Sequence, residues 1–229
     1  GTALGDIDSR EWLLEISNSP KAIALREKMQ ALYDSLDTED VASSAGLSIT
    51  VREFTSAPDG NTVKIRYTRP EGDETVPCVY YIHGGGMQTM SAFNGLYRPW
   101  GRIIAQQGVA VAMVDFRNRL TPSSAPEVEP FPAGLNDCVS GLEYMIGSAA
   151  EHGVDADHVI VAGESGGGNL TLATGLKLLQ EYPQPKQRIL QHSLVHLPER
   201  RQEVQVLQVV KRQRPASRLF LLQNLRTLQ

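Results

Sequence analysis

The sequence of 229 residues lacks the residue types that would assign it to several classes of protein. It has two cysteines, Cys78 and Cys138, and neither has a neighbour at metal-ligand spacing. One cysteine pair is too few for a disulfide-stabilised scaffold. No apolar run approaches the roughly 20 residues that span a bilayer, and the N-terminus lacks the pattern of a secretory signal. We therefore expect a cytoplasmic protein without a membrane span or a metal site.

The sequence also lacks an excess of positive charge. Its 22 Lys and Arg stand against 26 Asp and Glu, which gives a formal net charge of −4 at pH 7. This balance gives no reason to expect nucleic acid or an anionic membrane as a partner. The hydrophobic fraction of 41% is typical of a globular protein, and the length allows one sizeable core.

Glycine and aspartate are absent from residues 182–229, which contain nine glutamines and seven arginines. This segment has 9 basic and 2 acidic residues (net +7), whereas residues 1–181 have 13 and 24 (net −11). Such an abrupt change of composition indicates a different origin for the last segment, through a frameshift or a foreign extension. Apolar residues at helical spacing in 204–210 and 219–225 predict basic amphipathic helices there.

The first part of the chain carries helical signals over residues 8–37. Asp8 and Glu11 resemble a capping arrangement, and Ser19 and Pro20 are typical of an N-cap and a first helical residue. Spacings of three and four then place five apolar residues on one helix face: Ala22, Leu25, Met29, Leu32 and Leu36. We expect two helices, or one broken helix, before any strand.

The apolar period then changes to that of strands. Residues 48–54 and 62–67 alternate, and the turn residues at 58–61 predict an antiparallel hairpin between them. Three later strands and three helices alternate along the chain, which argues for a parallel sheet covered by helices. The expected strands are 76–82, 109–114 and 158–162, and the expected helices are 93–107, 134–150 and 168–181.

The segment Gly163-Glu164-Ser165-Gly166-Gly167 lies between the expected strand at 158–162 and the expected helix at 168–181. A G-x-S-x-G pattern is weak by itself, but a strand–turn–helix setting is what a nucleophile elbow requires. The glycines permit the tight turn, and the helix N-terminus directs N–H groups at the reacting centre. We interpret Ser165 as a catalytic nucleophile.

A second motif, His83-Gly84-Gly85-Gly86, follows the strand at 76–82. Acyl transfer places negative charge on the former carbonyl oxygen, and each preorganised N–H donor contributes roughly 2.7–4 kcal/mol to its stabilisation. Consecutive glycines let a backbone approach the substrate closely. We interpret this loop as part of an oxyanion hole, in which His83 fixes the loop by local hydrogen bonds and is not the general base.

These motifs resemble those of the hormone-sensitive-lipase-like (family IV) esterases of the α/β-hydrolase superfamily. The family has an HGGG motif and a GDSAG-type elbow, in which Glu164 takes the place of the commoner aspartate. Residues 114–117 with 130–134 resemble the family's D-Y-R-L-A-P-E…F-P-A-A segment. The likeness covers about residues 8–181.

The resemblance implies an α/β fold with a mostly parallel, α/β-hydrolase-like sheet and an N-terminal helical cap. It also implies hydrolysis of small, short-chain acyl esters without a cofactor. The oxyanion donors would be the backbone N–H groups of Gly85, Gly86 and Gly166, with Gly84 shaping the loop. We expect a cap segment at 1–45, a core at 46–181 and an atypical basic segment at 182–229, where the family's C-terminal strands and helices are missing or replaced.

The triad acid and base are not identified by the sequence. In this fold the order is Ser, then Asp or Glu, then His, and 48 residues after position 181 are too few for the family's remaining units. Glu181 followed by His192 or His196 keeps the formal order, but lies too close to the elbow helix to match the family. His152 and His158 precede the serine, and we expect them to be structural.

Two interpretations therefore stay open. The chain is a carboxylesterase that forms an acyl-Ser165 intermediate, or it is a catalytically impaired, truncated hydrolase or a non-catalytic ligand-binding relative that lacks the triad acid and base. A parallel sheet edge left bare by missing strands is an association hazard, so we also hypothesise self-association as a homodimer.

Overall fold

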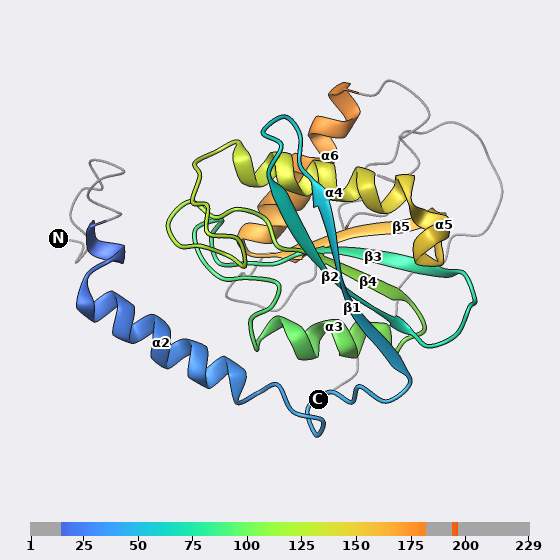
Figure 1. Ribbon diagram of the computed structural model, residues 1–229, viewed down its shortest axis with the longest axis horizontal. Coiled ribbons are helices and arrows are strands. Elements are labelled where there is room, and N and C mark those ends of the chain that lie inside the picture. Colours follow the sequence, from blue (N-terminus) through green and yellow to red (C-terminus); the bar gives the residue numbers. More distant parts are fainter. Residues whose placement is uncertain (1–14, 182–193, 197–229) are drawn as a thin grey trace.

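A twisted sheet with helices on both faces forms the body of the protein (Figure 1). The computed structural model describes residues 15–181 and 194–196. In that part of the chain the strands lie in the order β1-β2-β4-β3-β5-β6. Their bounds are β1 Leu47–Thr55, β2 Thr62–Pro70, β3 Val76–Ile82, β4 Ala110–Val114, β5 Val154–Glu164 and β6 Leu194–His196. The helices are α2 Pro20–Asp34, α3 Tyr97–Ala105, α4 Ala133–Gly147, α5 Ala149–His152 and α6 Gly166–Glu181.

The strand pairing confirms the expected mixture of a hairpin and a parallel sheet. Strands β1 and β2 pair antiparallel along their whole length, joined by a turn in which Gly60 has φ of 76°. Strand β2 also pairs antiparallel with β4, whereas β3, β4, β5 and β6 run parallel to one another. The short β6 was not predicted, and the helices expected at 204–210 and 219–225 lie outside the described residues.

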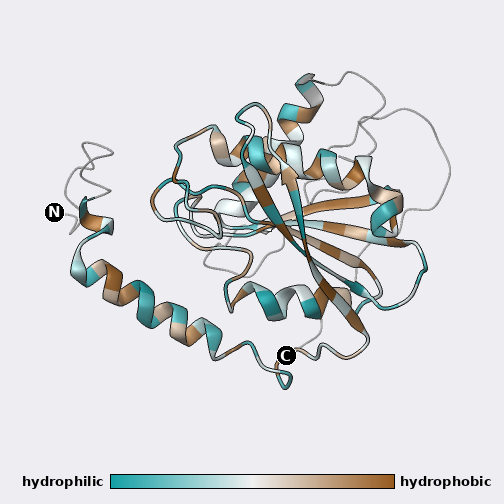
Figure 2. Ribbon diagram, in the orientation of Figure 1, coloured by the Kyte–Doolittle hydropathy of each residue, from teal (hydrophilic) through white to brown (hydrophobic). Residues whose placement is uncertain are grey.

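The core has two parts, one on each face of the sheet. Helices α4 and α6 pack their apolar residues on one face, where Tyr80 and Ile82 of β3 are fully buried. Helix α3 covers the other face, where Tyr97 packs with Tyr81 and Met113. Alternate side chains of β3 therefore contribute to the core on opposite faces of the sheet. Figure 2 shows that the central strands are hydrophobic.

Helix α2 begins as the sequence predicts, but its apolar face is not buried. The Ser19 hydroxyl accepts a hydrogen bond from the Ala22 N–H at 3.3 Å, and Pro20 is the first helical residue. Leu25 and Leu32 are nevertheless 60% and 54% exposed, and no residue of α2 is buried by the rest of the described chain. The helix lies beside the body (Figure 1); the earlier start expected at Asp8 is outside the described residues.

Ion pairs attach the C-terminal end of α2 to helix α3. Arg98 bonds to Asp34 at 2.9 Å and to Asp37 at 2.8 Å, and Arg102 bonds to Asp37 at 2.7 Å.

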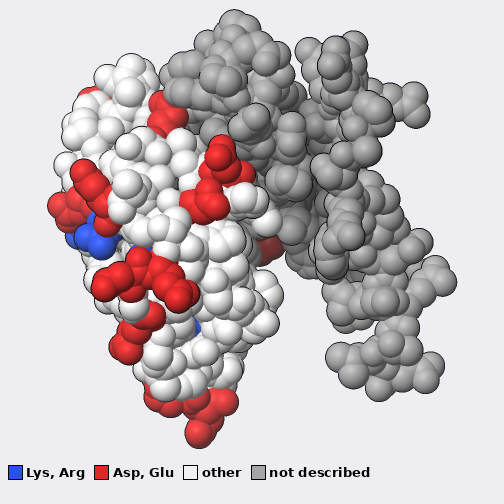
Figure 3. Space-filling model, turned by 90° about the vertical axis from the view of Figure 1, so that its right-hand side faces the viewer, with Lys and Arg blue, Asp and Glu red and all other residues white. Residues whose placement is uncertain are grey.

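On one face of the molecule, acidic side chains predominate over basic ones (Figure 3). No helix in the described part of the chain is long and apolar enough to cross a membrane.

Candidate active site

The turn between β5 and α6 holds Ser165 in a strained backbone conformation. Ser165 has φ of 52°, in the left-handed region that non-glycine residues rarely adopt. The turn is closed so tightly that a Cβ on Gly163 would lie 2.5 Å from the Gly167 carbonyl oxygen, and a Cβ on Gly167 would lie 2.0 Å from that of Ile82. Such strain costs of order 1–3 kcal/mol, and an observed outlier of this kind is a reason to look for function.

The glycine loop after β3 lies against this turn. Ile82 pairs with Gly163 in the β3–β5 ladder, so the two parallel strands end at the same edge of the sheet. A Cβ on Gly166 would lie 2.7 Å from Gly86 Cα and 2.8 Å from Gly86 N. Gly85 and Gly86 have φ of 98° and 66°, which glycine adopts without strain. Loop and turn are therefore in direct backbone contact.

His83 is buried inside the loop that it begins. Its ring stacks on Phe116 with centroids 4.3 Å apart, and its Nδ1 lies 2.8 Å from the Gly84 carbonyl oxygen. A carbonyl oxygen only accepts, so Nδ1 carries the proton and donates it. Burial lowers the pKa of His83, although Asp115 opposes this shift from 3.9 Å away. His83 is thus buried against the loop backbone, and its role in fixing the loop stays a prediction.

Tyr97 joins the loop to the turn, and sequence reasoning missed it. The Gly84 N–H donates to the Tyr97 hydroxyl oxygen at 2.9 Å, and that hydroxyl donates to Glu164 Oε1 at 2.6 Å. Glu164 is the residue before Ser165, and the space beside it admits no side chain on Gly84, because a Cβ there would lie 2.1 Å from Oε1. No motif contains Tyr97; the sequence indicates only that it lies within the helix expected at 93–107.

Two buried carboxylates hold the loops that follow β3 and β4. Asp115 accepts from the Ser91 hydroxyl at 2.6 Å and from the backbone N–H groups of Ala92 and Ser124 at 2.7 Å each. These bonds fix the loops on the same side of the sheet as the glycine loop.

The second carboxylate, Asp137 at the start of α4, pairs with a buried arginine. Asp137 accepts from the Arg117 backbone N–H, Nε and Nη2, each at 2.9 Å, and Arg117 also reaches Asp59 at 2.7 Å. Burial opposes the arginine charge, but these carboxylates hold the pKa of Arg117 above its ordinary value. The pair joins the end of β4, the start of α4 and the β1–β2 turn.

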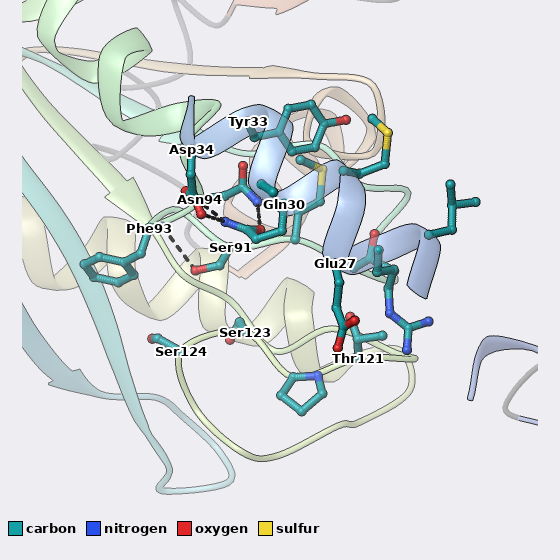
Figure 4. A pocket seen from close by; sticks show the side chains of 17 residues that line it. Glu27, Gln30, Tyr33, Asp34, Ser91, Phe93, Asn94, Thr121, Ser123 and Ser124 are labelled. Atoms are coloured by element: carbon teal, nitrogen blue, oxygen red, sulfur yellow. Dashed lines mark hydrogen bonds between the residues drawn. The ribbon is translucent and has the colours of Figure 1, made fainter. Parts of the chain in front are cut away.

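Among the described residues, two cavities lie beside the segment 84–94, which contains the glycine loop. The larger, about 940 Å³, lies between α2 and the loops at 89–94 and 121–124. Gln30 from α2 and Asn94 point toward each other across it and are hydrogen-bonded (Figure 4). The smaller, about 290 Å³, is lined by Gly86 itself together with the apolar side chains of Met87, Leu135 and Leu170. A small molecule in the smaller cavity would therefore touch the glycine loop directly.

The histidines differ in their relation to Ser165. His152 and His158 lie near the start of β5, whereas Ser165 follows its end, and the exposed His158 is bonded to Asp155 at 2.7 Å. The backbone of His196 in β6 is paired with Glu164; His192 is outside the described residues. Within the described ranges, no side chain is hydrogen-bonded to the Ser165 hydroxyl, and no group of His, Cys, Asp and Glu is arranged to hold a metal.

The sequence matches the family model described as alpha/beta hydrolase fold over residues 79–222. This match extends past Glu181 into the segment that differs in composition. Among solved structures, esterase Est22 has a TM-score of 0.80 and 55% identity, over 84% of this chain and 56% of that one. Another structure of Est22 contains p-nitrophenol.

Two more distant relatives are esterases as well. Brefeldin A esterase, a bacterial homologue of human hormone-sensitive lipase, has a TM-score of 0.65 and 31% identity, over 78% of this chain and 47% of that one. The carboxylesterase NlhH of Mycobacterium tuberculosis is 36% identical over 53% of this chain and 36% of its own length. The chain thus spans about half or less of the length of these relatives.

Proposed function

The chain belongs to the α/β-hydrolase fold family, in its hormone-sensitive-lipase-like branch, and from this we propose that it carries the nucleophile and oxyanion hole of a carboxylesterase. The observation that carries the proposal is Ser165 at φ of 52°, in backbone contact with a glycine loop. A strained serine beside free backbone N–H groups is the arrangement that acyl transfer requires.

The proposed reaction has two steps. The Ser165 Oγ attacks the ester carbonyl carbon and gives its proton to a base; the tetrahedral intermediate then expels the alcohol, which takes up that proton, and acyl-Ser165 remains. Water next attacks the acyl carbon and gives a proton to the base; the second tetrahedral intermediate expels the Ser165 oxygen, which takes up that proton, and the carboxylic acid is released. In both steps the oxyanion is bound by the N–H groups of Gly85, Gly86 and Gly166, with support from the positive end of the α6 dipole.

A short acyl group is the proposed substrate feature. The cavity of about 290 Å³ is lined by Gly86, by apolar side chains such as Leu135 and Leu170, and by polar and charged residues such as Arg119 and Glu129. An acyl chain against the apolar part would be desolvated next to the oxyanion donors. Because a structure of Est22 contains p-nitrophenol, p-nitrophenyl esters are a reasonable first probe. We expect acetate and butyrate esters to be better substrates than long-chain ones.

The base would have to come from the segment that follows α6. His196 is the described histidine whose backbone lies beside the turn, through its pairing with Glu164, and His192 precedes it in the chain. Since no described side chain bonds to the Ser165 hydroxyl, a second candidate function is a catalytically impaired or purely ligand-binding protein with the same pocket.

The test is hydrolysis of p-nitrophenyl acetate and butyrate by wild type, Ser165→Ala and the double variant His192→Ala/His196→Ala. His158→Ala is the matched histidine control, because His158 is exposed and lies near the other end of β5. If the chain is an esterase with its base in the C-terminal segment, wild type and His158→Ala should turn over. Ser165→Ala and His192→Ala/His196→Ala should lose turnover.

A different result would favour the second function. A single stoichiometric release of p-nitrophenol, or a trace rate indifferent to both histidines, means that this chain binds or acylates without turning over. A weak rate alone does not prove an intact triad, since an oxyanion hole and binding can leave about 10³–10⁴-fold catalysis over water. Equal rates for wild type and Ser165→Ala would refute Ser165 as the nucleophile.

A further inference from the structure

We propose that Tyr97 is a positioning residue of the oxyanion hole: its hydroxyl holds the glycine loop to the carboxylate of Glu164 and so fixes the donors relative to Ser165. The inference rests on the function proposed above and extends it to a residue outside the sequence motifs. The geometry consists of two hydrogen bonds, from Gly84 N–H to Tyr97 at 2.9 Å and from Tyr97 to Glu164 at 2.6 Å.

The glycine loop needs such a connection because its own contacts with the turn involve no interlocking side chains. Gly84, Gly85 and Gly86 have none, and Gly166 faces Gly86 backbone to backbone. Gly85 and Gly86 also have positive φ, and glycines have access to many alternative conformations. A loop of this composition keeps one geometry only where its backbone groups are bound, and Tyr97 binds the first of these N–H groups.

Tyr97 is itself well held. It is 3% exposed and begins α3, whose apolar side packs on the sheet. Its ring lies 5.5 Å from the His83 ring and 6.4 Å from the Tyr81 ring, measured between centroids. The next residue, Arg98, pairs with Asp34, the last residue of α2, and with Asp37 in the segment that follows it. The hydroxyl therefore has a fixed position from which to bind the loop.

The chemistry of the pair suits a permanent connection. Burial, with a further contribution from Glu164, raises the pKa of Tyr97, so the hydroxyl stays protonated and can donate at neutral pH. A donor paired with a carboxylate makes a stronger bond than a neutral pair. Glutamate at position 164 reaches Tyr97 across the loop edge, which gives its presence beside the nucleophile a physical role.

The first measurement is amide hydrogen exchange at Gly84, which does not depend on catalysis. Tyr97→Phe keeps the ring and deletes the hydroxyl, and we expect Gly84 to exchange roughly 5- to 10-fold faster, the factor that one hydrogen bond is worth. Tyr67→Phe is the matched control, because Tyr67 is also buried and donates to a carbonyl, that of His152, at 2.8 Å. Equal acceleration in both variants would reflect global destabilisation and overturn the proposal, as would no acceleration.

The second measurement is acylation by p-nitrophenyl acetate. A donor misplaced by a fraction of an ångström costs rate without costing binding, so Tyr97→Phe should lower kcat, or the burst rate, about 10- to 100-fold with KM within about twofold. Glu164→Gln retains an acceptor oxygen and should lose less than Glu164→Ala. In the double variant Tyr97→Phe/Glu164→Ala the losses should not multiply, because both changes break one connection.

The two measurements separate the failure of this inference from that of the proposed function. If wild type releases no p-nitrophenol, the esterase proposal fails, and Gly84 exchange alone decides whether Tyr97 holds the loop. If wild type reacts and Tyr97→Phe reacts equally fast, Tyr97 does not position the oxyanion donors, whatever the exchange rate. Multiplicative losses in the double variant would show that Tyr97 and Glu164 act separately.

Discussion

At the scale of single residues, the site depends on glycines that occupy space no side chain can share. Gly166 is the sharpest case, because a Cβ there would lie 2.7 Å from Gly86 Cα and 2.8 Å from the Met87 N. Both neighbours are backbone atoms, which cannot rotate away as a side chain does. An added methyl group must therefore move the glycine loop or the turn.

Gly166→Ala should lower the acylation rate by about 100-fold, because it displaces Gly86 from its position as an oxyanion donor. The same overpacking should reduce the free energy of unfolding by about 1–3 kcal/mol. Burst kinetics with p-nitrophenyl acetate and urea denaturation measure the two effects.

Gly147→Ala is the matched control for this substitution. Gly147 is exposed at the end of α4 and an added Cβ would meet nothing within 4 Å. The acylation rate should therefore stay at its wild-type value, and the free energy of unfolding should not decrease, because alanine is the better helix former. A Gly166→Ala variant that behaves like this control would contradict the backbone contact between loop and turn.

Residue-scale prediction from the sequence succeeds where chemistry demands a local pattern and fails where it depends on tertiary contact. Ser165 and the glycines are recognisable in the sequence, because a tight turn and a close backbone approach restrict which residues fit. Their catalytic roles stay predictions. Tyr97 lies 67 positions before its partner Glu164, and nothing local to either residue encodes the bond between them.

At the scale of elements, the Arg117–Asp137 pair connects the end of β4 to the start of α4. Asp137 is fully buried and accepts three hydrogen bonds from Arg117, which is 5% exposed. Breaking a buried pair by removing one charge leaves the other uncompensated in a medium that solvates it poorly.

Asp137→Asn should therefore reduce the free energy of unfolding by about 3–5 kcal/mol, measured by urea denaturation. Asp155→Asn is the matched control: Asp155 pairs with His158, but both side chains are well exposed, so this substitution should leave the free energy of unfolding nearly unchanged. Similar small losses in the two variants would mean that the buried pair contributes no more than a surface one.

The elements themselves were largely predictable, because hydrophobic period and turn chemistry are local signals. The β1–β2 hairpin, the buried strand β3 and the Ser19 cap of α2 all follow from such signals and are confirmed. What the apolar face of α2 packs against was not predictable. Periodicity identifies residues that share a face, but the partner of that face is a property of the assembled molecule, and the described chain leaves Leu25 and Leu32 exposed.

At the scale of the whole molecule, two buried histidines make stability depend on pH. His83 and His152 are 0% and 4% exposed. Burial lowers the pKa of each; Asp115 opposes the shift at His83, while Arg52 reinforces it at His152. In the unfolded chain both histidines regain an ordinary pKa near 6.5. Below that pH the unfolded state binds more protons than the folded state, so protonation favours unfolding.

The free energy of unfolding should thus be insensitive to these histidines above about pH 7 and decrease as the pH falls below about 6.5, by up to about 1.4 kcal/mol per pH unit for each. Urea denaturation at pH 7.5, 6.5 and 5.5 measures this slope. His152→Phe keeps a ring against Tyr67 and Tyr144 and should remove the share of one histidine from the slope. If His152→Phe and wild type lose stability in parallel, His152 takes up its proton in the folded state as readily as in the unfolded one, and burial does not keep it neutral.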